Sequence, residues 1–534
     1  MTGNAPDEWL RLPGAEPGER CAALTQERRA ACRSGIAGEW LPPEPWEAML
    51  SILVCHSYFL RFDSKQVERA KPYPPLATLQ CAALLRRAGH QVSLFDAMLA
   101  ADLAEYEHVL RATRPQVVLL YEDNFNFLSK MCLARMRRAA CQMIGSAHST
   151  GARVIAAGSD VSDAPEPYLL AGADVALKGE GLPALLEVLR RLDLAADSPP
   201  AALAEGVAGT ATLQRPGVAA INGAKLLPEV ELCERAAWDL IDMDRYRDAW
   251  LSAHGFFSLN LAASRGCSFR CAWCAKPIWG HHYLQREAAT VAREMSYLKR
   301  TFGPDHLWFA DDIFGFRVDW VRELAAAAQA ENAGIPFTIQ TRADLSSERM
   351  AQALREAGCV EAWLGAESGS QRILDAMNKG TTVAEILSAR ARLKAAGIRV
   401  GFFIQLGYLG EELGDILATR DLLSSAQPDD VGVSVAYPLP GTRFHEIVKA
   451  QLGPKTHWQD SNDLAMMFRG TYSSEFYRLV RDLLHAQVSL QADAAAHADA
   501  QYTVLREALE WRWQQLVAGE SQHRTPKRAP LLAG

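Results

Sequence analysis

Short apolar runs alternate with amphipathic segments through the N-terminal part of the chain. The apolar runs have the length of buried strands and lie at 51–55, 91–96, 116–121, 153–158 and 175–177. Between them, Pro74-Pro75-Leu76 opens a helical segment that ends at Gly89, and further helices are predicted at 103–112, at 130–143 and after 181. This rhythm predicts an α/β fold, a doubly wound (Rossmann-like) parallel sheet over residues 49–200.

The same alternation returns over residues 253–445. Strands are predicted at 257–262, 306–309, 337–340, 361–364, 401–404 and 430–434, with helices that include 318–330, 347–357, 370–377, 383–396 and 415–423. Six strand–helix units are too few to close an eight-stranded barrel, so we expect a partial (β/α)6 barrel of the TIM type. In parallel barrels the chemistry lies at the carboxyl ends of the strands.

Three other segments lack this alternation. Residues 1–48 are rich in Pro, Gly, Ala and charge and predict a poorly ordered lead-in. Residues 201–252 carry turn signals and short extended pieces, typical of a linker. Residues 446–534 predict a helical C-terminal domain, with an Ala-rich amphipathic run from Glu475 towards Leu516. We expect these helices to form a cap over the barrel mouth, where it would exclude water.

Composition indicates a globular enzyme and disfavours several other classes. The chain has 534 residues, of which 49% are hydrophobic and 22% charged, and its net charge is −7. An acidic chain without a long basic stripe disfavours a nucleic-acid partner. No signal peptide and no apolar run of membrane-spanning length is seen, so we expect no membrane partner. The 11 cysteines are scattered except for one trio. This pattern favours a reducing, cytoplasmic location.

That trio consists of Cys267, Cys271 and Cys274, with the spacing C-x3-C-x2-C behind an apolar run. Three thiolates on one loop can ligate three irons of a [4Fe–4S] cube and leave the fourth iron open to a chelating ligand. Three unrelated cysteines are one alternative. Part of a zinc site is another, although only His281 and His282 lie nearby. The spacing favours the cluster.

The order of these cysteines, with Trp273 before the last of them, resembles the radical S-adenosylmethionine (SAM) superfamily. The resemblance implies that the open iron chelates the amino-acid end of SAM. A reduced cluster would pass one electron to SAM, giving methionine and a 5′-deoxyadenosyl radical that abstracts hydrogen from an unactivated carbon. The electron would come from a donor such as flavodoxin or ferredoxin. The cofactors carry this chemistry, and the protein positions and shields them.

Polar residues follow the predicted barrel strands, and the resemblance implies that they and Trp273 contact SAM. Paired acids suit an ammonium group, and an arginine can hold a carboxylate by two parallel bonds. Helix capping stays an alternative for one of the two aspartates and for the glutamate. In strand order the residues are Asp311 and Asp312, Gln340 and Arg342, Glu367 and Ser368, Gln405, and Tyr437.

Glycines and polar residues also end the strands of the N-terminal sheet, where ligands of such sheets bind. By themselves these glycines could be turn residues only. However, Pro-Pro-Leu at 74–76, Gly-His-x-Val-x-x-x-Asp at 89–96 and Gly-Glu-Gly at 179–181 resemble the cobalamin-binding domain of one radical SAM class. The resemblance implies that cobalamin lies along Gly158, Ser159, Gly179, Glu180 and Gly181.

Two departures from the cobalamin pattern matter. The Asp-x-His-x-x-Gly loop that supplies a histidine to cobalt in cobalamin mutases is absent, and residues 157–160 read Ala-Gly-Ser-Asp where relatives often carry Gly-Gly-Pro-His. The resemblance therefore implies cobalamin without a histidine on cobalt. A domain that no longer binds cobalamin is the alternative.

The resemblance implies methyl transfer from methylcobalamin to a carbon of a small-molecule substrate, such as a natural product or pigment. SAM would also remethylate the cobalt. An oxidative cyclase or rearrangement enzyme, similar to the anaerobic magnesium-protoporphyrin ester cyclase, is the alternative within the class. Methylthio transfer is disfavoured because the N-terminal domain shows no second cysteine set. A non-catalytic cobalamin or redox sensor is the alternative of another class, but a sensor needs no SAM clamp.

Overall fold

The computed structural model describes residues 49–131, 133–215, 218–222, 235–274, 278–279, 281–494 and 500–526. The lead-in expected over residues 1–48 lies outside this part of the chain. All described residues belong to one compact unit, which comprises Pro42–Leu227 and Leu232–Gly534. Contacts between its N-terminal sheet and its barrel are therefore contacts within a single unit.

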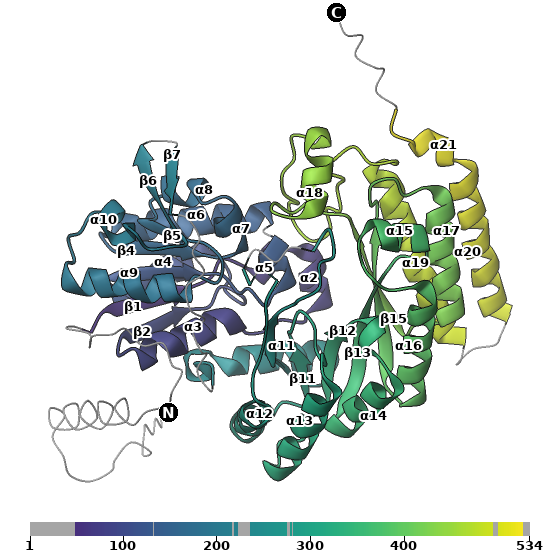
Figure 1. Cartoon of the computed structure of the whole chain (residues 1–534), viewed down its shortest axis with the longest axis horizontal. Coiled ribbons are helices and arrows are strands. Elements are labelled where there is room, and N and C mark those ends of the chain that lie inside the picture. Colours follow the sequence, from purple (N-terminus) through teal and green to yellow (C-terminus); the bar gives the residue numbers. More distant parts are fainter. Residues whose placement is uncertain are drawn as a thin grey trace, which may run out of the picture. The chain divides into compact units, whose positions relative to one another are not determined.

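A seven-stranded sheet with the order β2-β1-β3-β4-β5-β6-β7 forms the N-terminal part (Figure 1). The first five strands pair in parallel, which confirms the predicted doubly wound sheet. They are β1 (Ser51–Cys55), β2 (Gln91–Phe95), β3 (Val117–Tyr121), β4 (Arg153–Ala157) and β5 (Val175–Leu177). The strands β1, β3 and β4 are apolar and almost entirely buried, as expected for strands covered on both faces.

Two further strands, β6 (Thr210–Arg215) and β7 (Val218–Ile221), extend this sheet in the antiparallel sense. They lie in the segment expected as a linker. Because β5 is only three residues long and would otherwise leave its edge unpaired, these extended pieces supply it with backbone partners. The same segment also holds η2 (Trp238–Leu240) and α11 (Met243–His254).

Helices of the N-terminal part connect the strands much as predicted. One difference is the helix expected at 130–143, in whose place the structure has α5 (Phe127–Met131) and α6 (Ala134–Ser149). The others are η1 (Leu60–Phe62), α2 (Ser64–Arg69), α3 (Leu76–Arg87), α4 (Leu103–Thr113), α7 (Ser159–Asp163), α8 (Glu166–Leu170), α9 (Leu182–Leu194) and α10 (Pro200–Ala204).

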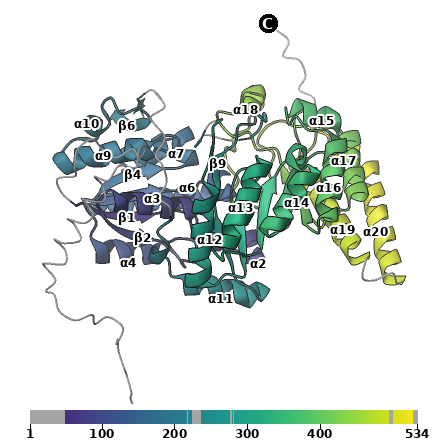
Figure 2. The ribbon, with the colours of Figure 1, turned by 60° about the horizontal axis from the view of Figure 1, so that its bottom comes forward.

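Six parallel strands with the order β15-β14-β13-β12-β11-β8 form the predicted partial barrel. They are β8 (Ser258–Leu261), β11 (His306–Phe309), β12 (Phe337–Thr341), β13 (Cys359–Glu367), β14 (Arg399–Leu406) and β15 (Asp430–Val435). Figure 2 shows α12, α13, α14 and α16 in a row along its outer face. The barrel helices are α12 (Ala288–Phe302), α13 (Val318–Ala330), α14 (Glu348–Ala357), α15 (Gln371–Ala376), α16 (Val383–Ala395) and α17 (Leu413–Ala426).

A small antiparallel hairpin follows the first barrel strand. It pairs β9 (Ser264–Gly266) with β10 (Tyr283–Gln285), and the residues between them include the three cysteines. The hairpin therefore fixes where the cysteine loop leaves the barrel and where it returns. Its strands are too short and too polar to have been predicted from hydrophobic periodicity.

The C-terminal part is helical, as expected, with α18 (Arg443–Val448), η4 (Lys449–Gln451), α19 (Ser474–Ala494), α20 (Ala500–Ala518) and α21 (Glu520–His523). The helix α19 packs against β15 and α17, and α20 lies beside α19 (Figure 1). These long helices thus cover the edge strand β15, which an unclosed sheet would leave open. The expected cap over the barrel mouth stays a prediction. Among the described helices, none is both long and apolar enough to cross a membrane.

Candidate functional site

The cysteine loop is fastened to the barrel by main-chain hydrogen bonds. The Ala272 amide donates to the Met377 carbonyl at 2.8 Å, and the Ala272 carbonyl accepts from the Phe444 amide at 2.9 Å. These bonds hold the loop against the end of α15 and the start of α18. Trp273 packs on the apolar cluster formed there, so this predicted SAM contact also serves to anchor the loop.

The three thiols differ in exposure. Cys267 is buried, Cys271 is partly buried and Cys274 is exposed. Across the described ranges, no group of three or more His, Cys, Asp or Glu side chains is arranged to hold a metal ion. The three thiols therefore share one short loop but are not gathered around a metal position there, and their ligation of a cluster stays a prediction.

Arg342 lies directly beside this loop. Its Nη1 is 3.5 Å from Cys271 Sγ, and its guanidinium carbon lies 3.7 Å from the centre of the Phe269 ring. The two parallel bonds expected for the SAM carboxylate go to Asp344, at 2.8 and 3.0 Å. A carboxylate two residues away satisfies the guanidinium fork locally, so Arg342 places a fixed positive charge next to the thiols.

The two aspartates after β11 are both engaged. Asp311 is fully buried and accepts hydrogen bonds from the Ala263 amide at 3.0 Å and from the Ser264 hydroxyl, and burial raises the pKa of its carboxyl to about 7. Asp312 forms an ion pair with Lys130 of α5. Capping of the next helix is not their role, because the N-cap of α13 is Arg317. Asp311 thus supports the turn into the cysteine hairpin.

Glu367 and Lys379 form a buried ion pair at the end of β13. The Lys379 Nζ is 2.8 Å from Glu367 Oε1, and the two side chains are only 6% and 11% exposed. Glu367 has a φ of +62° next to a register shift between β13 and β14, a strained conformation of the kind that clusters at functional sites. Helix capping is not its role either, since the N-cap of α15 is Ser370.

Sequence reasoning missed Lys379. Its ammonium lies 5.4 Å from the centre of the Trp273 ring, and its carbonyl accepts from Arg342 Nη2 at 2.7 Å. This lysine thereby joins three predicted SAM residues, Trp273, Arg342 and Glu367. No sequence signal marks it, because a lysine after a short helix is ordinarily exposed.

The other predicted SAM residues have mixed surroundings. Gln340 donates to the Asp311 carbonyl at 2.7 Å, and the Ser368 hydroxyl lies 3.3 Å from that of Thr419. The Tyr437 hydroxyl donates to the Met131 carbonyl at 3.3 Å, towards the N-terminal sheet. Among the described residues, Gln405 Oε1 is buried without a hydrogen-bond partner. A buried unsatisfied oxygen at a strand end is a place where a ligand can donate.

Gly158, Ser159 and Gly179, which we call the glycine-lined cradle, follow β4 and β5 at the carboxyl ends of the N-terminal strands, where ligands of such sheets bind. Gly158 has a φ of +153°, and a Cβ placed on it would lie 2.8 Å from the Glu122 side chain. The neighbouring Ser159 hydroxyl is buried and, within the described ranges, has no partner. The Gly179 amide donates to Ser162 Oγ at 2.9 Å. The close approach at Gly158 is to the chain's own Glu122, whereas the unsatisfied Ser159 hydroxyl fits a bound organic ligand.

Glu180, predicted to contact cobalamin, forms an ion pair with the barrel, and its contact with cobalamin stays a prediction. Its carboxylate pairs with Arg265, two residues before the first cysteine of the trio. The glutamate of the Gly-Glu-Gly sequence therefore binds the barrel loop, while Gly179 and Gly181 lie on either side of it next to the cradle.

A buried polar network lies beside the cradle. His56 Nε2 is 2.9 Å from Asp96 Oδ1, and Asp96 also accepts from the Tyr246 hydroxyl at 2.6 Å. Burial acts to lower the pKa of His56, but the Asp96 hydrogen bond and nearby carboxylates outweigh it and raise that pKa. Three separate segments of the chain supply this network, so no sequence motif predicts it.

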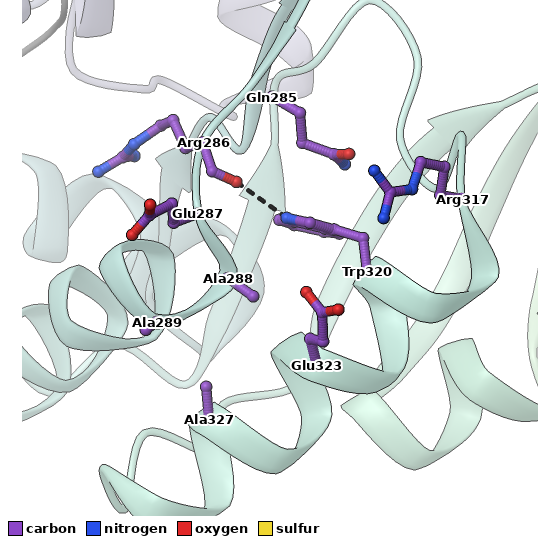
Figure 3. Close-up of a pocket in the computed structure, with 9 residues that line it drawn as sticks. All are labelled: Gln285, Arg286, Glu287, Ala288, Ala289, Arg317, Trp320, Glu323 and Ala327. Carbon is purple, nitrogen blue, oxygen red and sulfur yellow. Dashed lines mark hydrogen bonds between the residues drawn. The ribbon is translucent and has the colours of Figure 1, made fainter. Parts of the chain in front are cut away.

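A separate hollow of about 540 Å³ opens on the outer side of the barrel (Figure 3). Figure 3 shows the Trp320 ring between Arg317 and Glu323, with its indole nitrogen donating to the Arg286 carbonyl at 2.8 Å. None of the predicted site residues lines this hollow. We assign it no part in the chemistry.

Gly266 limits how the chain can enter the cysteine loop, which gives a testable prediction. Its φ is +76°, and a Cβ there would collide with the carbonyl of His282, the residue just before β10. Gly266→Ala should therefore displace Cys267 and prevent cluster reconstitution, measured as iron per chain. The matched control is Gly255→Ala, where φ is +72° but nothing lies within 4 Å, so only about 1 kcal/mol of backbone strain is added. Equal iron content in both variants would contradict the prediction.

Comparison with known proteins supports this view of the barrel. The family model described as the radical SAM superfamily matches residues 261–423. An uncharacterized methyltransferase of Pyrococcus horikoshii is 25% identical over 383 residues, which cover 70% of this chain and 78% of that protein. The anaerobic magnesium-protoporphyrin IX monomethyl ester cyclase of Cereibacter sphaeroides is 26% identical over 285 residues, 52% of this chain and 45% of the cyclase. This chain thus spans less than half of that cyclase.

Among solved structures, the radical SAM methyltransferase TsrM from Kitasatospora setae, with cobalamin and a [4Fe–4S] cluster bound, has a similar fold. The TM-score is 0.62 at 19% identity, covering 77% of this chain and 79% of TsrM. At this identity the likeness concerns the fold alone. The family model, with the C-x3-C-x2-C loop that follows the first strand of a six-stranded parallel barrel, identifies residues 261–423 as a radical SAM domain.

Proposed function

We propose that this chain is a cobalamin-dependent radical SAM enzyme that methylates an unactivated carbon of a small molecule. The cluster and SAM would supply a 5′-deoxyadenosyl radical, and methylcobalamin would supply the methyl group. The observation that carries the proposal is the cradle at Gly158, Ser159 and Gly179 in the same compact unit as the cysteine loop.

The chain's own residues would bind and orient the cofactors. Cys267, Cys271 and Cys274 would ligate the cluster beside the Arg342 cation. The buried amide oxygen of Gln405 would accept a hydrogen bond from SAM. Glu367 uses Oε1 to bind Lys379, so its other carboxylate oxygen would be a further acceptor at the same end of the barrel. Gly158 and Ser159 would lie along the cobalamin. Such fixed polar groups orient the reactants without rearrangement during the reaction.

The similarity to the magnesium-protoporphyrin ester cyclase supports a second candidate, an oxidative ring-forming reaction. It would use the same cluster, SAM and cradle, so the residues described above fit both reactions. The two reactions differ in products, because only a methyltransferase consumes a second SAM as a methyl donor and releases S-adenosylhomocysteine.

The test uses anaerobically reconstituted full-length protein with SAM and a chemical reductant, with and without cobalamin. We expect 5′-deoxyadenosine in both cases and S-adenosylhomocysteine only with cobalamin, whose binding is followed by visible absorption. If no S-adenosylhomocysteine forms in the presence of cobalamin, the cyclase is favoured. An intact cluster that yields no 5′-deoxyadenosine would instead favour a sensor.

A further inference from the structure

Glu180 contacts the chain on both sides of the cysteine loop. Its carboxylate pairs with Arg265, which precedes Cys267 by two positions. Its amide donates to the carbonyl of Ile278, which follows the last cysteine, at 3.0 Å. One residue in the turn after β5 therefore contacts both ends of the loop that carries the three thiols.

The position of Glu180 is itself fixed by its surroundings. Its carbonyl accepts from the Tyr121 hydroxyl at 2.8 Å, and the adjacent Gly179 amide is bound to Ser162. The Glu180 and Arg265 side chains are only 19% and 9% exposed. A shielded pair of this kind is little screened by solvent, and loss of one partner leaves an uncompensated buried charge.

A second contact from the same domain lies next to Ile278. The Lys130 ammonium pairs with Asp312 and lies 4.9 Å from the centre of the Trp279 ring, which also contacts Phe125 at 5.2 Å. The residue that follows Ile278 is thus held by the N-terminal part as well. Both flanks of the cysteine loop depend on the N-terminal sheet and not only on the barrel.

We propose that Glu180 is a positioning residue that couples ligand binding in the glycine-lined cradle to the order of the cysteine loop. Glu180 lies between Gly179 and Gly181, so a ligand that fixes these glycines also fixes the carboxylate that holds Arg265. Coupling between two sites is reciprocal, so a loaded cluster tightens ligand binding by the factor by which the ligand stabilises the cluster. This inference rests on the proposed function, with cobalamin as the ligand of the cradle.

The experiment measures the dissociation constant of hydroxocobalamin for cluster-free and for cluster-loaded full-length protein, under anaerobic conditions. In the native protein the loaded form should bind about 5- to 50-fold more tightly, the range of ordinary allosteric coupling. Glu180→Gln keeps the main-chain hydrogen bond to Ile278 but removes the charge. The ratio of the two dissociation constants, cluster-free to cluster-loaded, should therefore fall close to one. Arg265→Gln should lower this ratio in the same way. The double variant should lower it no further than either single variant.

Glu187→Gln is the matched control, because Glu187 lies in the same domain and pairs only within its helix with Arg190 and Arg191. Its ratio should equal that of the native protein. Circular dichroism and the thermal midpoint check that the variants are folded. A Glu180→Gln protein that keeps the native ratio overturns the proposal.

A second readout does not need cobalamin. The cluster's visible absorption is followed while an iron chelator removes it, and we expect loss about fivefold faster in Glu180→Gln than in Glu187→Gln. If the native protein binds no cobalamin, the cobalamin part of the proposed function fails, and the chelator rate alone decides whether Glu180 holds the loop. Equal rates in the two variants then reject that role.

Discussion

Cys271→Ala is expected to abolish both the iron–sulfur cluster and SAM cleavage. With two thiols left on the loop, a cube cannot keep three protein-bound irons and one open iron. Cys271 is also the thiol beside the Arg342 guanidinium, so its loss leaves that buried cation without its sulfur neighbour. Iron should fall from about four per chain to near zero, and 5′-deoxyadenosine should fall to background.

Two other cysteines serve as controls for this prediction. Cys141 is partly buried in α6, and Cys359 is buried at the start of β13. Their alanine variants should retain iron and activity, although Cys359→Ala leaves a small cavity. Loss of the cluster in the Cys359 variant, or its retention in Cys271→Ala, would mean that the ligands are not those of the C-x3-C-x2-C loop.

Lys379→Met is expected to weaken SAM binding and to destabilise the protein. Methionine keeps much of the side-chain volume but leaves the Glu367 carboxylate buried and unpaired, which costs about 3 kcal/mol. Since Glu367 has a strained φ of +62°, the loss of its partner should let the end of β13 rearrange. We expect the KM for SAM to rise about tenfold or more and the urea midpoint to fall.

Further variants distinguish the effect of the Lys379 charge from the effect of its side-chain packing. Lys394→Met changes an exposed lysine of α16 and should have no effect, whereas Lys379→Arg should recover part of the SAM affinity. In Lys379→Met, a second change of Glu367→Gln removes the unpaired charge and should restore stability without restoring SAM binding. If the single Lys379 variant binds SAM normally, the ion pair has no part in the site.

Most of the fold could be predicted from the sequence because its strands are continuous apolar runs. β1, β3 and β4 are buried on both faces, so their identity as strands depends little on context. The antiparallel strands β6 and β7 were missed as parts of the sheet. Their place depends on the open edge of β5, and a pairing partner cannot be inferred from periodicity alone.

The sequence by itself determined the chemistry available to this protein: three thiols on one short loop, and polar residues after successive parallel strands, meet at the same end of a barrel wherever that fold forms. Only the tertiary structure decided how those residues are used. Asp311 binds the turn before the cysteines, Arg342 binds Asp344, and Glu180 binds Arg265. Lys379, which no sequence pattern indicates, binds Glu367. The physical reason is that a buried charge must find its partner in space, and such partners come from strands and loops far apart along the chain.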